Sequence, residues 1–213
     1  MSFEKISIVT PSFNQGRFLE ETILSVIGQD YPNLEYIIMD GGSTDNSVEI
    51  IKKYERHLAH WESEKDRGQA HAINKGFALA TGTIFGWLNS DDFYLPDTLS
   101  FVAEQLNAAE PELLFGNCRH FVDGGQLTYG SDVRREHETR DLQLGDYVIQ
   151  PSSFWTRAAW LNTGVLDESL HFGFDWDWFI RAQRAGVTFK PVDRYLSSYR
   201  IHGAHKTGNQ SAS

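Results

Sequence analysis

Apolar runs alternate along the first half of the chain with segments whose apolar positions recur at helical spacing. This pattern predicts four strands, at about residues 6–9, 36–39, 60–62 and 83–88. It also predicts helices at about residues 18–27, 48–54 and 69–79, and a further helix after Pro96. Such alternation is typical of βα units that build a parallel sheet. We therefore expect a single α/β, Rossmann-like domain with a mainly parallel central sheet flanked by helices.

The regular alternation ends after about residue 116. Residues 112–115 predict a fifth strand, and residues 121–129 predict a hairpin around Asp123-Gly124-Gly125. Beyond the hairpin we expect a charged, irregular segment at 134–146, a helix at 175–185 that ends at Gly186, and strands at 187–190 and 195–201.

Composition restricts the kinds of partner. The formal net charge of −10 argues against a broad nucleic-acid surface, because phosphate binding needs clustered Lys and Arg. Cys118 is the only cysteine, which excludes an intramolecular disulfide. No run of about eighteen consecutive apolar residues occurs. We expect a soluble, cytoplasmic protein that binds no nucleic acid, and leave open a peripheral association with the inner face of a membrane.

Polar segments follow three of the predicted strands, at residues 10–14, 40–45 and 89–92. The carboxyl ends of parallel strands meet at one edge of a sheet, where folds of this class bind ligands. Asp91 and Asp92 leave a buried strand as adjacent carboxylates, which repel each other unless a cation or solvent separates them. Oxygen ligands of this kind suit Mg²⁺ or Mn²⁺. The alternative for each segment is a helix cap, since Asp, Ser and Asn are common capping residues.

Seven motifs together resemble those of family 2 glycosyltransferases of GT-A fold, and the resemblance spans nearly the whole chain. They are Ile8-Val9-Thr10-Pro11-Ser12-Phe13-Asn14, Asp40-Gly41-Gly42-Ser43-Thr44-Asp45, Glu64-Lys65-Asp66-Arg67-Gly68-Gln69, Ala72-Ile73-Asn74-Lys75-Gly76, Trp87-Leu88-Asn89-Ser90-Asp91-Asp92, Asp175-Trp176-Asp177-Trp178 and Tyr199-Arg200-Ile201-His202. The resemblance implies a GT-A catalytic domain over residues 1–205, followed by a flexible polar tail over residues 206–213. It also implies sugar transfer from a nucleotide-diphosphate sugar to a hydroxyl of a saccharide, lipid-linked or polymeric acceptor.

The resemblance further implies a donor site with a divalent cation, Mn²⁺ or Mg²⁺. Asp91 would be the main metal ligand, with Asp92 beside it. His202 would reach the metal or the diphosphate, and its alternative is an ordinary hydrogen-bonding histidine. The residues expected to bind the nucleotide sugar are Thr10, Pro11, Ser12, Asn14, Asp40, Gly41, Ser43, Asp66, Gly68, Asn74, Asn89 and Ser90.

Two positions depart from the family pattern. Asn89 stands where the acidic motif often begins with aspartate, and its amide can contact a ribose or coordinate a metal through its oxygen. Gly41 stands where many relatives carry a second aspartate that often binds uracil. UDP, the nucleotide most often used in the family, is therefore not assigned as the donor nucleotide of this chain.

The resemblance places a catalytic base, Asp175, at the start of a late helix. Asp175 would accept the proton of the acceptor hydroxyl while that oxygen attacks the anomeric carbon from the face opposite the phosphate, which gives inversion. The alternative for Asp175 is a helix cap. Asp177 should point away from it on a helix and is the natural control. The residues Trp155, Trp176 and Trp178 are either an apolar wall for the acceptor sugar or part of the core.

Two other classes of function remain open at this stage. A glycoside hydrolase could use Asp91 or Asp92 with Asp175 as an acid and base pair. A carbohydrate-binding domain could keep the fold without turnover, and replacing Asp175 would then change nothing measurable. A hydrolase should not respond to a nucleotide and Mn²⁺, whereas a glycosyltransferase should.

Overall fold

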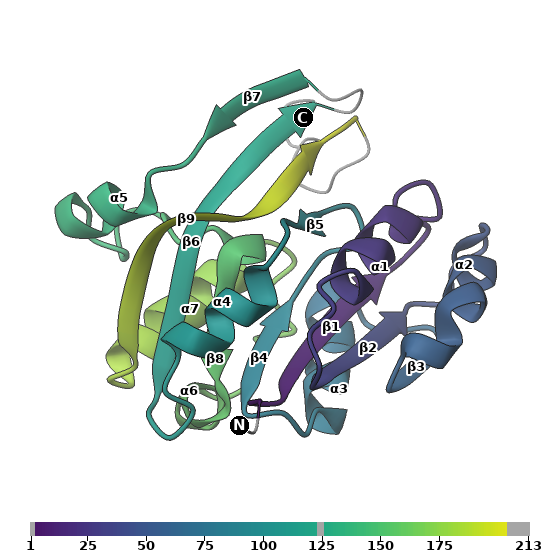
Figure 1. Ribbon diagram of the computed structural model, residues 1–213, viewed down its shortest axis with the longest axis horizontal. Helices are drawn as coiled ribbons and strands as arrows, with labels where there is room; N and C mark the ends of the chain where they lie inside the picture. Colours follow the sequence, from purple (N-terminus) through teal and green to yellow (C-terminus); the bar gives the residue numbers. More distant parts are fainter. Residues whose placement is uncertain (1–2, 123–125, 204–213) are drawn as a thin grey trace.

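The computed structural model describes residues 3–122 and 126–203, which form one nine-stranded sheet with helices packed on both faces (Figure 1). The sheet order is β3-β2-β1-β4-β8-β6-β9-β5, and β7 pairs with β6. The strands are β1 (Ile6–Ser12), β2 (Leu34–Asp40), β3 (His60–Ser63), β4 (Ile84–Trp87), β5 (Phe93–Tyr94), β6 (Glu112–Val122), β7 (Gln126–Gly130), β8 (Ser153–Thr156) and β9 (Thr188–Ile201). The α-helices are α1 (Leu19–Ile27), α2 (Ser47–Tyr54), α3 (Gln69–Leu79), α4 (Thr98–Gln105), α5 (Val133–Thr139), α6 (Arg157–Thr163) and α7 (Phe174–Arg184).

The first four strands are all parallel. β1 pairs with β2 and with β4, and β2 pairs with β3. These strands and helices α1 to α3 confirm the βα units predicted from the apolar pattern. The chain adds β2 and β3 on one side of β1 and then places β4 on the other side. Strand order therefore switches between β1 and β4, and open sheets of this kind bind ligands in the crevice at the carboxyl ends of such strands.

The second half of the sheet is mixed. β8 pairs antiparallel with β4 and β6, β5 pairs antiparallel with β9, and β6 pairs in parallel with β9. The α/β class is confirmed, and the mainly parallel arrangement that we expected describes the half that holds β1 to β4. The predicted hairpin is confirmed as the antiparallel pair of β6 and β7, while its expected turn, residues 123–125, lies outside the described residues.

The structure departs from the sequence prediction at three places in this half. The segment 134–146 is irregular only from residue 140 onward, because residues 134–139 belong to α5, whose N-cap Asp132 accepts a hydrogen bond from the backbone N of Arg135 (3.3 Å). The strands expected at 187–190 and 195–201 are one strand, β9, since its pairing with β6 continues through two register shifts. Strand β8 was missed because all four of its residues are buried and show no alternation.

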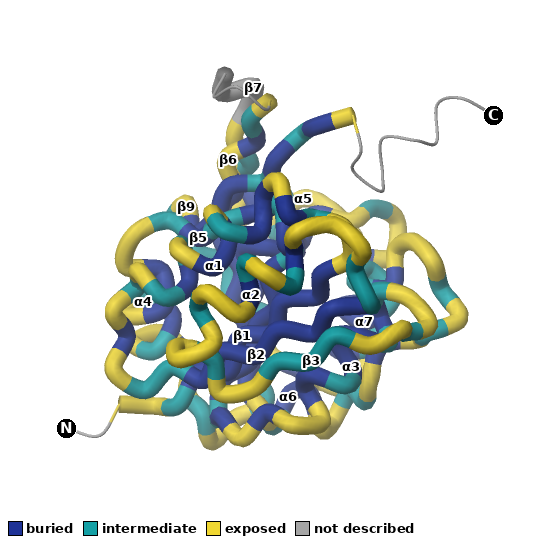
Figure 2. Tube along the Cα trace, turned by 90° about the vertical axis from the view of Figure 1, so that its right-hand side faces the viewer, coloured by how far each residue is buried: buried dark blue, intermediate teal, exposed yellow. Residues whose placement is uncertain are grey.

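Apolar side chains form a core on each face of the sheet. Successive side chains of a strand point to opposite faces, so Tyr36 of β2 packs in the core with α1, and Ile37 packs in the core with α3. Figure 2 shows β1 and β2 as buried strands among exposed loops and helices. Helix α3 lies very close to β1, because a Cβ added at Gly76 would be 2.5 Å from Cγ1 of Val9. The sheet is thus covered by packed side chains on both faces at its switch point.

Candidate functional site

Two loops at the carboxyl edge of β1 and β2 are tied to each other. Asn14 donates its backbone N–H to Oγ of Ser43 (2.7 Å), and its Oδ1 accepts from the backbone N of Thr44 (2.8 Å). Asp40, at the end of β2, accepts hydrogen bonds from the backbone N of Ser43 (2.9 Å) and from Oγ of Ser63 (2.6 Å). The structure therefore brings the predicted residues Asn14, Asp40 and Ser43 together in one network at the rim of the crevice.

The predicted residues Thr10, Pro11 and Ser12 end β1 and are all buried. Oγ1 of Thr10 lies 3.0 Å from Oη of Tyr36, so this side chain belongs to the interior. Oγ of Ser12 has no hydrogen-bond partner among the described residues. Buried polar atoms normally have a partner, so Ser12 is the residue of the three whose buried side chain has unused hydrogen-bonding capacity.

Phe13 and Asp66 both lie against Gly41. Phe13 is 60% exposed although it is a large apolar residue. A Cβ added at Gly41 would lie 3.3 Å from Cδ2 of Phe13 and 2.7 Å from Oδ2 of Asp66. The backbone N of Gly68 donates to Oδ1 of Asp66 (2.8 Å), which holds the carboxylate there. The carboxylate of Asp66 thus occupies the space that a side chain at position 41 would need, beside an exposed aromatic ring.

Sequence reasoning did not select Phe13 as a site residue. The signal for it was present, because a large aromatic residue stands in an otherwise polar loop directly after a buried strand. A side chain of that kind would usually be buried, and its exposure at the ligand edge is informative.

The two carboxylates of the acidic turn after β4, those of Asp91 and Asp92, have different surroundings. Oδ2 of Asp91 lies 3.0 Å from Nε2 of His202. Asp92 is 1% exposed, and its Oδ1 accepts a hydrogen bond from the backbone N of Arg200 (3.0 Å). Burial and the neighbouring charge of Asp91 raise the pKa of Asp92 well above its ordinary value. The structure therefore brings Asp91 together with His202, and it turns Asp92 into the protein.

Asn89 and Ser90 begin the same turn. Oδ1 of Asn89 accepts from Nε2 of Gln69 (2.8 Å), and Nδ2 of Asn89 donates to Oε1 of Gln150 (3.2 Å). Gln150 in turn donates to the backbone O of Trp87 (2.9 Å). Ser90 is buried. The amide at position 89 is therefore held in a chain of side chains that connects α3 with the end of β4.

The donor atoms of Asp91 and His202 fit a divalent cation. The two atoms are hydrogen-bonded to each other at 3.0 Å, and this distance also suits two adjacent ligands in an octahedral site with bonds of about 2.1 Å. Within the two described ranges, no group of three or more His, Cys, Asp and Glu residues could hold a metal ion. Phosphate oxygens and water would complete the coordination, as is usual for Mg²⁺.

A cavity lies next to His202, between the loop after β1 and the end of β9. Its volume is about 550 Å³. It is lined by Phe13, Asn14, Gln15, Arg17, Phe18, Val122, Ile201, His202 and Gly203. The candidate cation site therefore adjoins a space that is large enough for part of a substrate.

Helix α7 begins close to the end of β4. The ring of Phe174 lies 6.2 Å from that of Trp87, the last residue of β4. Asp175 follows in the first helical turn, and its Oδ1 accepts from the backbone N of Trp176 (3.0 Å). Although Asp146 as a residue is exposed, desolvation of its carboxyl group and the charge of Asp175 raise its pKa to about 7. Two carboxyl groups thus interact at the start of α7.

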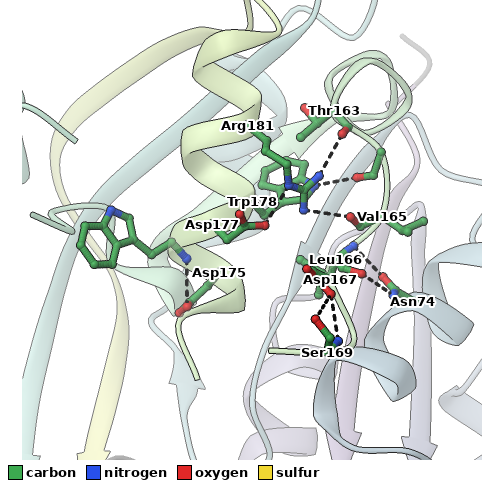
Figure 3. Close-up of polar contacts among 12 residues, drawn as sticks. Asn74, Thr163, Val165, Leu166, Asp167, Ser169, Asp175, Asp177, Trp178 and Arg181 are labelled. Carbon is green, nitrogen blue, oxygen red and sulfur yellow. Dashed lines mark hydrogen bonds and ion pairs between the residues drawn. The ribbon is translucent and has the colours of Figure 1, made fainter. Parts of the chain in front are cut away.

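Asp177 points away from Asp175, as expected for positions two apart on a helix (Figure 3). Its Oδ2 accepts a hydrogen bond from Nε of Arg181 (2.8 Å). The same guanidinium donates to the backbone O of Thr163 (3.0 Å) and of Val165 (2.9 Å). Asp177 therefore helps to hold the loop that precedes α7.

The three tryptophans considered for an acceptor wall separate into two groups. Trp155 and Trp178 are fully buried and belong to the core, with ring centroids 4.7 Å apart. Trp176 is partly exposed and donates from Nε1 to the backbone O of Leu142 (2.7 Å). Trp176 alone remains available to contact a sugar.

Asn74 holds the other side of the loop that leads to α7. Its Nδ2 donates to the backbone O of Leu166 (3.0 Å), and its Oδ1 accepts from the backbone N of Leu166 (3.0 Å), as Figure 3 shows. Nδ2 also donates to Oε1 of Glu168 (3.1 Å), and Glu168 pairs with Arg67. The structure thus places Asn74, which the resemblance assigned to the donor, in a structural contact.

The order of strands in the sheet and the helices on both of its faces define an α/β fold of GT-A type. Residues 7–164 match the family model described as glycosyl transferase family 2. The chain therefore belongs to glycosyl transferase family 2.

Relatives extend the likeness beyond the matched residues. The chain is 27% identical over 216 residues to an uncharacterized glycosyltransferase of Nostoc sp., which covers 94% of this chain and 66% of the relative. Its fold is similar to that of residues 1–349 of S. aureus TarS in complex with UDP-GlcNAc, with a TM-score of 0.76, 18% identity, and coverage of 96% of this chain and 61% of that TarS fragment. It is also similar to the mannosyltransferase PcManGT from Pyrobaculum calidifontis in complex with GDP-Man and Mn²⁺, with a TM-score of 0.71, 17% identity, and coverage of 96% and 59%.

Within residues 3–122 and 126–203, every helix is too short or too polar to span a bilayer.

Proposed function

We propose that this chain is an inverting glycosyltransferase that moves a sugar from a nucleotide-diphosphate sugar to a hydroxyl of a saccharide, lipid-linked or polymeric acceptor. The observation that carries the proposal is the 3.0 Å contact of Asp91 with His202 beside the switch point between β1 and β4. Membership of family 2 supports it. The nucleotide-sugar complexes of the two structurally similar proteins support it as well.

Asp91 and His202 would hold a divalent cation, Mn²⁺ or Mg²⁺. A cation bound there supplies charge neutralisation for the departing nucleoside diphosphate. The Mn²⁺ in the complex of the similar mannosyltransferase supports this part of the proposal. Asp92 would support the site without binding the cation. Its buried carboxyl group accepts a hydrogen bond from the backbone N of Arg200 and so fixes the end of β9 against the acidic turn.

Phe13 and Asp66 would bind the nucleotide base. An exposed aromatic ring offers a stacking surface to a flat heterocycle. The carboxylate beside it can accept a hydrogen bond from a ring N–H, which uracil, thymine and guanine carry and cytosine lacks. Asp66 would thereby replace the aspartate that is absent at Gly41, and donors based on UDP, dTDP or GDP are favoured over those based on CMP.

Asp175 would act as the general base. Its carboxylate accepts the proton of the acceptor hydroxyl while the hydroxyl oxygen forms a bond to the anomeric carbon. The bond from that carbon to the diphosphate oxygen breaks, and its electron pair leaves with the nucleoside diphosphate. Because attack and departure take place on opposite faces of the carbon, the configuration inverts.

A thermal-shift screen tests the proposal. UDP, GDP, dTDP and CMP are each added with Mn²⁺, with Mg²⁺ or with EDTA, because a ligand of the native state raises the melting temperature. We expect a cation-dependent rise with one of the diphosphates. Asp91→Ala should lose the cation-dependent part, and the matched control Glu104→Ala, an exposed carboxylate on α4, should keep it.

The screen also separates the other classes of function. A glycoside hydrolase should show no shift with any nucleotide, which would overturn the transferase proposal. A non-catalytic domain that kept the nucleotide site should shift but transfer no sugar from any donor with the responding base.

A further inference from the structure

Arg200 is a buried cation beside the candidate metal site. The residue is 6% exposed, and its Cζ lies 4.8 Å from the ring centroid of Phe18 and 4.7 Å from that of Phe121. Phe18 immediately precedes α1, and Phe121 lies near the end of β6. Two aromatic rings from distant parts of the chain therefore enclose one guanidinium, in the arrangement that favours cation–π attraction.

The polar contacts of Arg200 converge on the acidic turn. Its Nε donates to the backbone O of Asp91 (3.0 Å), and its backbone N donates to Oδ1 of Asp92 (3.0 Å). Its Nη2 forms an ion pair with Glu21 of α1. Arg200 thus binds the main chain of the proposed metal ligand Asp91 and the side chain of Asp92. Glu21 of α1 pairs with the same guanidinium.

The same residue governs the position of the second proposed ligand. His202 follows Arg200 by two residues and lies directly after β9, which ends at Ile201. The ring of Phe18, which covers the guanidinium, also packs on His202 at 4.5 Å between centroids. Displacement of Arg200 would therefore move Asp91 and His202 relative to each other.

We propose that Arg200 is a positioning residue that sets the separation of Asp91 and His202 and thereby the affinity of the site for its cation. This inference rests on the cation site of the proposed function. Lysine cannot replace Arg200, because a single ammonium cannot reach the carbonyl of Asp91 and the carboxylate of Glu21 with the geometry of a planar guanidinium.

The experiment measures the Mn²⁺ concentration that half-saturates binding of UDP or GDP to the full chain, by isothermal titration calorimetry. Loss of a residue that orients metal ligands typically weakens metal affinity by about 10- to 100-fold, and we expect a rise of that size for Arg200→Lys. Arg194→Lys is the matched control, because Arg194 lies on the same strand with its Cζ 4.4 Å from the ring centroid of Phe101. The control should have the half-saturating concentration of the wild type.

The experiment distinguishes failure of the proposed function from failure of the positioning role. Wild-type protein that binds neither nucleotide in a cation-dependent way would overturn the proposed function. Wild-type binding with an unchanged Mn²⁺ requirement in Arg200→Lys would overturn the positioning role and leave the proposed function standing. A merely structural Arg200 would lower the melting temperature without changing that requirement. If the Arg200 variant does not fold, Glu21→Gln is tested in its place, because the side chain of Glu21 is 55% exposed and its replacement should leave the protein folded. A severalfold rise in the half-saturating Mn²⁺ concentration supports the positioning role of Arg200, and an unchanged concentration overturns it.

Discussion

Replacing Asn74 by alanine should destabilise the protein by about 2–4 kcal/mol, because it leaves two buried backbone groups without partners. The change removes the two 3.0 Å hydrogen bonds to the backbone of Leu166 and the 3.1 Å hydrogen bond to Glu168. Leu166 is 1% exposed, so its N–H and C=O would lose their partners inside the protein. Each unsatisfied buried group costs about 1–3 kcal/mol, and entry of water keeps the total in the lower part of the summed range.

Thermal and urea unfolding measure this effect. For a chain of this size, the expected loss corresponds to a fall in Tm of about 5–15 °C. Asn162→Ala is the matched control, because Asn162 is exposed on α6 and its replacement should change stability by less than about 0.5 kcal/mol. Nucleotide affinity, measured below the melting transition, should survive in Asn74→Ala. A variant with the Tm of the wild type and no nucleotide binding would refute the structural role and make Asn74 a donor ligand.

Three further predictions concern other parts of the molecule. Gly76→Ala should cost about 1–3 kcal/mol in urea unfolding, because its Cβ would be 2.5 Å from Cγ1 of Val9, whereas Gly145→Ala, which has open space, should be silent. Asp175→Asn should lower kcat for sugar transfer by about 10²–10⁴ and leave nucleotide affinity unchanged, and transfer at the wild-type rate would assign the base elsewhere. The pKa of Asp146 is raised from 3.8 to about 7, so the fold favours its neutral form; the stability this contributes is complete below pH 3.8 and is lost as pH rises through about 7. Relative to Asp146→Asn, the wild-type Tm should therefore fall over that window, and parallel Tm profiles would contradict the shift.

The first half of the fold could be predicted because each βα unit there carries its own signal. Its strands are bounded by polar turns, and α3 begins and ends where the apolar spacing predicts, at residues 69 and 79. Strand β8 carried no such signal, since a short, fully buried strand has no alternating pattern. The continuity of β9 depends on pairing with β6, which is a contact between distant segments and is invisible to local pattern.

The site was predictable to the level of the sheet edge. Parallel strands end together, so Asp40 and Asp91 could be expected on one side of the sheet from their positions after apolar runs. The sequence pattern alone could not show which polar side chains form hydrogen bonds inside the protein and are therefore not free to bind a ligand. The amide of Asn74 is engaged by a backbone 92 residues away, and Thr10 is engaged by a tyrosine 26 residues away. Such pairings follow from the tertiary structure and not from local propensity.

The candidate cation site joins residues 111 positions apart, Asp91 in the middle of the chain and His202 near its far end. Contacts between segments so distant form late, because the intervening chain must be ordered before they bring any stabilisation. During synthesis, the amino-terminal βα units emerge first and can fold while residue 202 is still missing. A nascent chain that already displays the acidic turn would therefore bind a cation at the candidate site only weakly, and competence to capture the cation would coincide with the docking of β9 and His202.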